Sequence, residues 1–276
     1  MDRAAIAEAL NLVDDRRPEA RARAAKLLAG LVPRAKLIGI TGPPGSGKSS
    51  LVAALLDVWR AEGKTVGVLA VDPSSSRSGG ALLGDRLRMM RAAPDDGVFI
   101  RSLASRGELG GLAAEVFPMS QVMAAAFDLV VVETVGIGQS EIDVADATDT
   151  VCLVVQPASG DTVQFLKSGI MEVPHLFVVS KSDLGVSARR TARELEAALG
   201  GNAPVLLASA TRREGIVEVA RALEQPRPDR RAERGRRWIE KRLREEFGSA
   251  GLARLGGVPQ TDESPFALLE RLRAKL

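Results

Sequence analysis

The sequence predicts an α/β protein, a P-loop NTPase fold with a mostly parallel central sheet flanked by helices. Short apolar runs rich in β-branched residues recur along the chain, and most are separated by stretches with apolar residues at helical spacing. Continuous apolar runs of this kind are typical of strands that helices cover on both faces of a parallel sheet. A glycine-rich segment, "GPPGSGKSS" (42–50), joins the first run to a helical stretch, which is the strand–loop–helix order of a phosphate-binding loop.

The first elements along the chain are helical. Residues 3–13 and 18–31 are rich in Ala, Leu and Arg with apolar residues at helical spacing, so we expect two helices ahead of the first strand. The apolar runs that follow predict strands at 36–41, 65–71, 98–100, 128–133, 150–155, 175–180 and 204–208.

A proline-bearing basic stretch at 224–237 interrupts this alternation. Beyond it we expect one helix with an apolar face over 238–247 and a last helix that begins at Ser264 and Pro265. The segment "GSAGLARLGGVPQTDES" (248–264) between them is interpreted as a flexible linker. The chain is therefore expected to have three parts: an N-terminal helical extension (1–34), a P-loop domain (35–225) and a C-terminal helical arm (226–276).

Composition limits the classes of function. Of the 276 residues, 45% are hydrophobic and 26% charged, and Lys+Arg 38 against Asp+Glu 35 is too even a balance to indicate binding to nucleic acid. A single Cys and a single His cannot form a thiol or imidazole metal cluster within one chain. No segment reaches the ~18 apolar residues of a membrane span, and the first residues have no signal-peptide core. We expect a cytoplasmic protein with no membrane partner.

The glycine-rich segment predicts a nucleoside triphosphate as ligand. Gly42, four further residues, Gly47, Lys48 and Ser49 have the full phosphate-loop spacing, which is far more demanding than a lone glycine triplet. In such a loop, backbone N–H groups point at the phosphates, the lysine reaches the β/γ oxygens, and the serine hydroxyl ligates Mg²⁺. The residues expected to bind the phosphates are Gly42, Gly45, Ser46, Gly47, Lys48, Ser49 and Ser50.

Acidic residues at strand ends predict the remainder of a Mg²⁺ site. The apolar run "DLVVVE" ends in Glu133, and Gly136 follows where its N–H can meet the γ-phosphate, as in the D-x-x-G element of switch GTPases. Glu in place of Asp leaves its role open between a magnesium-bound water and the attacking water. Asp72 ends another strand in the same way, and Asp85 follows in "LLGDRLRMM". The candidate metal residues are Ser49, Asp72, Asp85 and Glu133.

The segment "FVVSKSD" (177–183) indicates which base is bound. In GTPases a strand leads into N-K-x-D, whose aspartate accepts hydrogen bonds from guanine while the lysine stem lies over the ring. Lys181 and Asp183 match this pattern, and Ser180 replaces the Asn. "LLASAT" (206–211) supplies a Ser-Ala pair, Ser209 and Ala210, of the kind whose backbone meets the guanine oxygen. The sequence therefore favours GTP over ATP.

Longer stretches resemble a known family, the MeaB/ArgK/MMAA group of the SIMIBI class of GTPases. The match runs in order through "ITGPPGSGKSSL", "LAVDPSSSRSGGALLGDRLRM", "FIRSLASRGELGGLA", "VVVETVGIGQSE", "DTVQFLKSGIME" and "SKSD", which together cover about residues 36 to 185. The resemblance implies a GTP-hydrolysing chaperone that gates cofactor loading and protects an adenosylcobalamin-dependent acyl-CoA mutase such as methylmalonyl-CoA mutase. It also implies a homodimer built through the C-terminal arm.

Four residues are candidates for catalysis of GTP hydrolysis: Lys48, Glu133, Arg106 and Lys167. Lys48 is expected to neutralise the γ-phosphate together with Mg²⁺. Nothing in the sequence marks a built-in arginine finger, but Arg106 lies in a glycine-bearing loop from which a partner could bring it toward the phosphates. Lys167 is chosen through the resemblance, because "DTVQFLK" resembles a loop that senses nucleotide and partner; from its own context it could equally be a solvated helix residue.

Two other functions would use the same phosphate loop. A metal-delivery GTPase of the same class shares the phosphate loop, but such proteins use thiol or imidazole clusters to hold the metal. A P-loop small-molecule kinase would share the triphosphate site, but "SKSD" and "ETVGIG" would then have no role.

Overall fold

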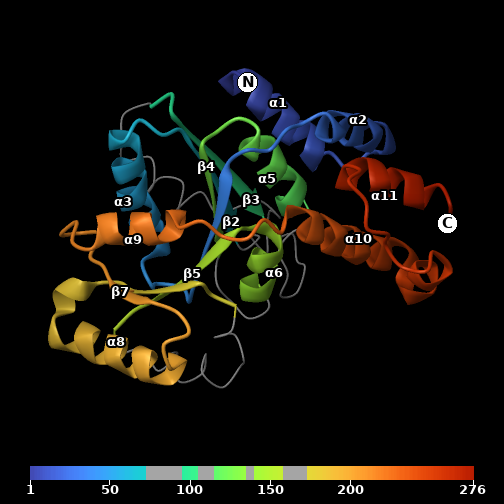
Figure 1. Ribbon diagram of the computed structural model, residues 1–276. Helices are drawn as coiled ribbons and strands as arrows, with labels where there is room; N and C mark the ends of the chain where they lie inside the picture. Colours follow the sequence, from blue (N-terminus) through green and yellow to red (C-terminus); the bar gives the residue numbers. More distant parts are fainter. Residues whose placement is uncertain (73–94, 105–114, 135–139, 158–172) are drawn as a thin grey trace, which may run out of the picture. The chain divides into compact units, whose positions relative to one another are not determined.

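The computed structural model of the chain describes residues 1–72, 95–104, 115–134, 140–157 and 173–276 (Figure 1). The chain divides into two compact units. A helical unit comprises Met1–Ala35, Ala114–Ala126 and Pro228–Leu276, and a sheet unit comprises Lys36–Ala113 and Phe127–Arg227. The helical unit is thus assembled from three separate stretches of sequence.

Within the residues that the structure describes, the sheet unit has seven parallel strands in the order β3-β2-β4-β1-β5-β6-β7. Every apolar run that predicted a strand forms one, and the mostly parallel P-loop fold predicted from the sequence is confirmed. The strands are β1 Lys36–Thr41, β2 Val66–Asp72, β3 Val98–Ala104, β4 Leu129–Thr134, β5 Thr150–Val155, β6 Leu176–Val179 and β7 Val205–Leu207.

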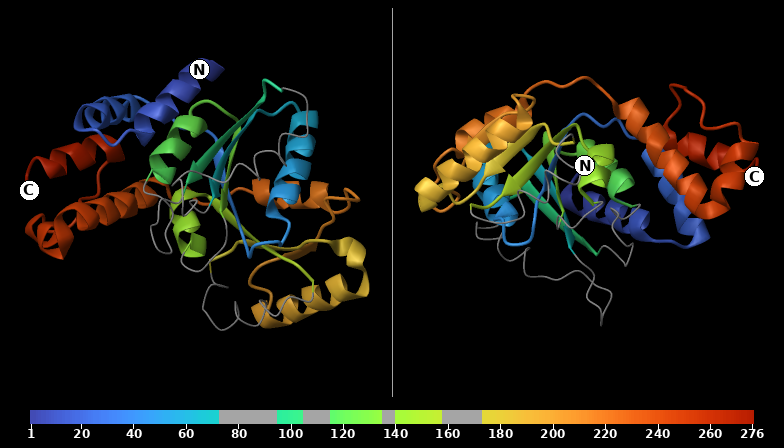
Figure 2. Two further views of the ribbon diagram at one scale, coloured as in Figure 1. Left: turned by 180° about the vertical axis from the view of Figure 1, so that it is seen from behind. Right: turned by 90° about the horizontal axis from the view of Figure 1, so that it is seen from below.

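Helices cover both faces of this sheet, which explains why its central strands are apolar throughout (Figures 1 and 2). On one face, α3 (Lys48–Ala61) and α9 (Ile216–Glu224) pack on side chains such as Cys152 and Val154 of β5. On the other face, α8 (Val186–Leu199) packs on Leu153 and Val155, the alternate residues of the same strand. Burial raises the pKa of the Cys152 thiol well above its ordinary value, so this cysteine is an inert part of the core.

The sheet and α6 (Ser140–Ala147) approach most closely at Gly39, in the middle of β1. A Cβ atom at this position would lie 2.7 Å from Cγ2 of Val144 and 2.8 Å from Oγ1 of Thr148, both tighter than side chains tolerate. Thr148 is itself fixed, because its hydroxyl donates a 2.7 Å hydrogen bond to the carbonyl of Val144. Only glycine allows this approach.

The helical unit contains α1 (Arg3–Asp14), α2 (Pro18–Ala29), α5 (Val116–Ala124), α10 (Arg231–Arg254) and α11 (Pro265–Arg273). Its C-terminal helices share a core of Ile239, Leu243, Val258, Leu268, Leu269 and Leu272. An aromatic cluster joins α5 to them: the Phe117 ring stacks on Trp238 with centroids 5.3 Å apart, and Phe266 meets Trp238 edge-on at 5.1 Å.

Two features of this unit differ from the sequence interpretation. The segment expected to be a linker at 248–264 contains a second helical stretch of α10, which follows the non-helical Gly248 (φ 67°, ψ −177°) and ends at Arg254. The apolar faces over 238–247 and 266–276 belong to the arm that was expected to form a dimer. They are instead largely covered within the chain, by each other and by α5. Phe247, 40% exposed, is the exception among the large apolar residues of these faces.

Gly39→Ala is predicted to destabilise the sheet unit by ~1–3 kcal/mol, because the added methyl group forces Val144 or Thr148 to move within a packed core. The free energy of unfolding in denaturant measures the effect. Gly30→Ala is the matched control: Gly30 ends α2 at φ −87°, and its added Cβ would meet nothing closer than 3.6 Å. Equal stabilities of the two variants would contradict the close approach at Gly39.

Candidate nucleotide site

The candidate residues that the structure describes gather at one edge of the sheet, because the strands of that sheet all run in the same direction. The phosphate loop follows β1, Glu133 lies near the end of β4, and the predicted base-binding segments follow β6 and β7. In open parallel sheets, this carboxyl edge is where ligands bind. The sequence motifs therefore meet in one place although they are spread over more than half of the chain.

The phosphate loop (42–47) leaves β1 through a backbone conformation that requires glycine. Gly42 has φ 140°, and a Cβ atom there would lie 2.0 Å from the carbonyl oxygen of Val154 in the neighbouring strand β5. The loop thus packs closely against the edge of the sheet and leads directly into α3, which begins at Lys48. The N-terminus of this helix presents N–H groups and the positive end of its dipole, which favour a bound phosphate.

Lys48 is buried and lies along the loop that it serves. Its Nζ donates hydrogen bonds to the carbonyl oxygens of Gly42 at 2.8 Å and Pro43 at 3.0 Å. The ammonium group is therefore held next to the backbone that would surround the phosphates. A phosphate-loop lysine acts on the β/γ oxygens of a bound triphosphate, and Lys48 stays the candidate for that role.

Ser49 and Glu133 lie together, as the Mg²⁺ prediction requires. The Ser49 hydroxyl donates a 2.7 Å hydrogen bond to Oε1 of Glu133, which is only 5% exposed. Glu133 lies between β1 and β2 in register with Ile40 and Ala70, so β4 presents it beside the phosphate loop. A hydroxyl and a carboxylate at one point fit Mg²⁺, a hard cation that prefers oxygen ligands.

Ser180 connects the base segment to the phosphate loop. Its buried hydroxyl lies 2.6 Å from the carbonyl oxygen of Ser46 and 3.0 Å from that of Val155, either of which can accept its hydrogen bond. The next residue, Lys181, has a left-handed backbone (φ 52°), and its Nζ donates to Gly45 O at 2.9 Å and to Oε1 of Gln156 at 2.7 Å. Ser180 and Lys181 thus hold the two loops together.

Asp183 is oriented by Ser209, the residue predicted from the downstream Ser-Ala pair. It lies in a short 3₁₀ helix, η2 (Ser182–Leu184), and its Oδ1 accepts a 2.6 Å hydrogen bond from the Ser209 hydroxyl. This hydrogen bond is the main reason that the pKa of Asp183 lies below its ordinary value, with a backbone hydrogen bond adding to it. The carboxylate therefore stays ionised to a lower pH than an ordinary aspartate and can accept N–H groups of guanine.

The other predicted residues are placed less fully. Ser50 is exposed in the first turn of α3, and Ala210 is partly buried against the core behind the site. Asp72 is the last residue of β2, beside β4 in the sheet, but its side chain lies outside the described part. Four further predicted residues lie outside the described residues altogether: Asp85, Arg106, Gly136 and Lys167.

Three polar residues at this edge were missed in the sequence. Thr134 donates a 2.9 Å hydrogen bond to Thr41, so the ends of β4 and β1 are joined beside the phosphate loop. Gln156 directly follows β5 and accepts from Lys181. The sequence contains a signal for these residues, because each is a polar residue at the carboxyl end of an apolar run.

No group of three or more His, Cys, Asp and Glu side chains lies close enough to hold a metal ion within the described ranges. Among the helices in those ranges, none combines the length and the apolar character that crossing a bilayer requires.

Comparisons with known proteins point to one family. The family described as "Methylmalonyl Co-A mutase-associated GTPase MeaB" matches residues 6–254. A Pyrococcus abyssi protein named as a GTPase is 42% identical over 258 residues, which cover 88% of this chain and 79% of the relative. A Caenorhabditis elegans protein named "Methylmalonic aciduria type A homolog, mitochondrial" is 38% identical over 214 residues, 71% of this chain and 54% of the relative.

A solved structure has the same fold over nearly the whole chain. The crystal structure of a protein titled LAO/AO transport system kinase superposes with a TM-score of 0.69 at 29% identity, covering 99% of this chain and 93% of the other.

Asp183→Asn is predicted to weaken GTP binding about 10- to 100-fold and to shift preference toward XTP, because the amide donates where the carboxylate accepts. Titration with fluorescent analogues of both nucleotides measures the shift. Asp229→Asn, at an exposed aspartate of the helical unit, controls for loss of charge. An Asp183→Asn protein that binds GTP like the parent and gains nothing with XTP would show that the base assignment is wrong.

Ser180→Ala is predicted to raise the KM for GTP several-fold, since one net hydrogen bond contributes roughly 0.5–1.5 kcal/mol, and to leave kcat nearly unchanged. The variant removes the hydroxyl next to the Ser46 carbonyl and leaves both loops otherwise intact. Ser180→Thr retains a hydroxyl and is expected to restore the affinity. A loss in kcat alone, with KM unchanged, would contradict a role in positioning the phosphate loop.

Proposed function

Because this chain belongs to the family of methylmalonyl-CoA mutase-associated GTPases, we propose that its GTPase activity serves an adenosylcobalamin-dependent acyl-CoA mutase of the methylmalonyl-CoA mutase type. In this proposal the protein is a chaperone that gates loading of the mutase cofactor and protects the mutase. The observation that carries the proposal is the family match over residues 6–254. The arrangement of the phosphate, base and acidic residues at one sheet edge supports the nucleotide part of it.

GTP is bound, in this proposal, along the carboxyl edge of the sheet. The phosphates lie against the backbone N–H groups of the 42–47 loop and the start of α3, with the Lys48 ammonium group on the β/γ oxygens. Asp183 accepts the N–H groups of guanine, and Ser209 keeps its carboxylate oriented and ionised.

Mg²⁺ fits beside the γ-phosphate at Ser49 and Glu133. When bound there, the ion would supply positive charge that stabilises the transferred phosphoryl group. The Ser49 hydroxyl would then ligate it, and Glu133 would hold a metal-bound water or orient the attacking water through its carboxylate. Asp72 and Asp85 are further candidates for this neighbourhood.

Hydrolysis is expected to be slow without a partner. None of the arginines whose side chains the structure describes is our candidate for contact with the γ-phosphate. A positive charge added in the transition state raises the rate of hydrolysis by a factor of ~10³–10⁵. Arg106 and Lys167, outside the described residues, are our candidates for this charge once the mutase is bound. Coupling between nucleotide and mutase is reciprocal, so the GTP and GDP forms should differ in affinity for the mutase.

The homodimer and the cytoplasmic location stay predictions. The buried aromatic and aliphatic residues of α10 and α11 are not the basis for a dimer, because they pack within the helical unit. A dimer would have to use other surface.

Methylmalonyl-CoA mutase is predicted to accelerate single-turnover GTP hydrolysis, because it is the partner proposed to complete the charge around the γ-phosphate. Rates are measured with and without the mutase, and its affinity is measured for the protein loaded with GDP or with a non-hydrolysable GTP analogue. Arg106→Ala and Lys167→Ala should lose the acceleration while keeping the slow basal rate.

Lys26→Ala, at an exposed lysine of α2, is the control for a general loss of positive charge. Lys48→Ala exposes any contaminating GTPase. If parent rates are equal with and without mutase and both nucleotide forms bind it equally, the chaperone proposal is wrong, while the assignment of the GTP site is unaffected.

A further inference from the structure

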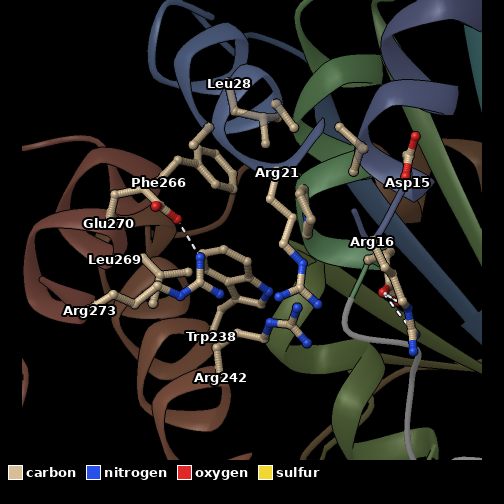
Figure 3. Close-up of a pocket in the computed structure, with 15 residues that line it drawn as sticks. Asp15, Arg16, Arg21, Leu28, Trp238, Arg242, Phe266, Leu269, Glu270 and Arg273 are labelled. Atoms are coloured by element: carbon tan, nitrogen blue, oxygen red, sulfur yellow. Dashed lines mark hydrogen bonds and ion pairs between the residues drawn. The ribbon is translucent and has the colours of Figure 1, made fainter. Parts of the chain in front are cut away.

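A second pocket lies entirely within the helical unit, and the GTPase function gives it no role. Residues from the α1–α2 connection, α2, the start of α5, α10 and α11 line it (Figure 3). Its volume of about 70 Å³ is roughly five times the ~10–15 Å³ that one water molecule needs. The pocket therefore has room for a small polar group that enters from solvent.

Arginine side chains are concentrated in this pocket. Arg16, Arg21, Arg242 and Arg273 all line it, and they come from four different elements. Figure 3 shows Arg21, Arg242 and Arg273 directed toward one another around the indole of Trp238. Like charges brought together in this way repel unless an anion lies among them.

Two carboxylates of the pocket, Glu115 and Glu270, pair with two of its arginines, and Asp15 pairs with an arginine outside it. Glu115, 8% exposed at its side chain, forms an ion pair with Arg16 at 2.9 Å. Asp15 accepts from Arg17, whose Nε lies 2.9 Å away.

On the C-terminal helices, Glu270 is an ion-pair partner of Arg273, which also meets Glu246 outside the pocket. The ion pairs of Arg242 are long, 3.4 Å to Glu245 and 3.9 Å to Glu246, so they contribute little. Its Nε is buried and has no hydrogen-bond partner among the described residues.

Arg21 has no ion-pair partner among the residues that the structure describes. It is exposed on α2, one turn from the buried Ala24 that also lines the pocket. Arg21 and Arg242 thus offer two guanidinium groups whose donors are not committed to close carboxylates. Guanidinium groups bind phosphate through paired N–H donors more specifically than a lysine does.

The wall of the pocket opposite these charges is apolar and rigid. Trp238 stacks on Phe117 and meets Phe266 edge-on, so the indole is held in place on α10. Leu269 of α11 continues the apolar surface. Small-molecule sites usually combine an apolar wall of this kind with a few polar groups that face it.

We propose that this pocket binds an organic phosphate, with the phosphate between Arg21 and Arg242 and the organic part against Trp238. A phosphate monoester has three terminal oxygens that can accept hydrogen bonds from the converging guanidinium groups, whereas a carboxylate has only two oxygens. The size of the cavity suits a single phosphate group rather than a polyphosphate. This site is separate from the phosphate loop and does not depend on the proposed function.

Phenyl phosphate is the probe that tests the proposal; inorganic phosphate lacks its ring, and benzoate keeps a ring but carries a carboxylate in place of the phosphate. The chain contains two tryptophans, so Trp59→Phe leaves Trp238 as the only fluorescent reporter in the pocket. Saturable quenching by phenyl phosphate is expected, with weaker binding of inorganic phosphate and of benzoate. Calorimetry on the parent chain gives the same affinities without the Trp59 substitution.

Arg21→Gln is expected to weaken phenyl phosphate binding about tenfold, as loss of a charged hydrogen bond implies. Arg23→Gln is the matched control, because Arg23 is exposed on the same helix and does not line the pocket. Added salt should weaken binding to the parent.

Two results would overturn the proposal: no saturable binding of phenyl phosphate to the parent in either measurement, or equal affinities of the Arg21→Gln and Arg23→Gln variants. Benzoate binding tighter than phenyl phosphate would instead identify a carboxylate site and overturn the choice of phosphate.

Discussion

The uniform direction of the seven strands is the constraint on which the nucleotide site depends. Parallel strands need helices on both faces, and these connections return every strand end to the same edge. Gly42, Glu133, Ser180 and Ser209 therefore come to the same edge although they lie at the ends of four different strands. The core that enforces this arrangement is apolar on both faces, as the alternate residues of β5 illustrate. Polar atoms are concentrated where the strands end, because elsewhere in the sheet they would lack partners.

Side-chain hydrogen bonds at that edge connect one loop to the next. Ser180 and Lys181 join the base segment to the carbonyl oxygens of the phosphate loop, and Thr134 joins β4 to β1. A hydrogen bond to a backbone carbonyl can hold a loop in place whatever side chain the residue at that position carries. At position 180, where the N-K-x-D pattern has Asn, the Ser hydroxyl makes such a hydrogen bond to the Ser46 carbonyl at 2.6 Å.

Much of the fold could be predicted because its signals are local. Apolar runs such as 128–133 lie close to the observed strands, and the phosphate-loop spacing identifies the turn after β1. Contacts between distant segments could not be predicted in the same way. Nothing near Gln156 indicates Lys181 as its partner, and nothing in the sequence around Phe117 shows that it stacks on Trp238. Gly248 does interrupt α10, as glycine ordinarily does, and what the sequence interpretation missed is the further helical stretch that follows it as far as Arg254.

The helical unit draws on three stretches of sequence, with α5 contributed from between two strands of the sheet unit. Neither unit can therefore be obtained by cutting the chain at a single point. Removal of the C-terminal arm takes away Trp238 and Phe266 and leaves Phe117 of α5 without its aromatic neighbours. In a truncated protein, the effect of losing the arm could not be separated from the effect of disrupting the core that the arm shares with the remaining segments. The arm is better studied by point substitutions, or by a circularly permuted chain that keeps all three stretches.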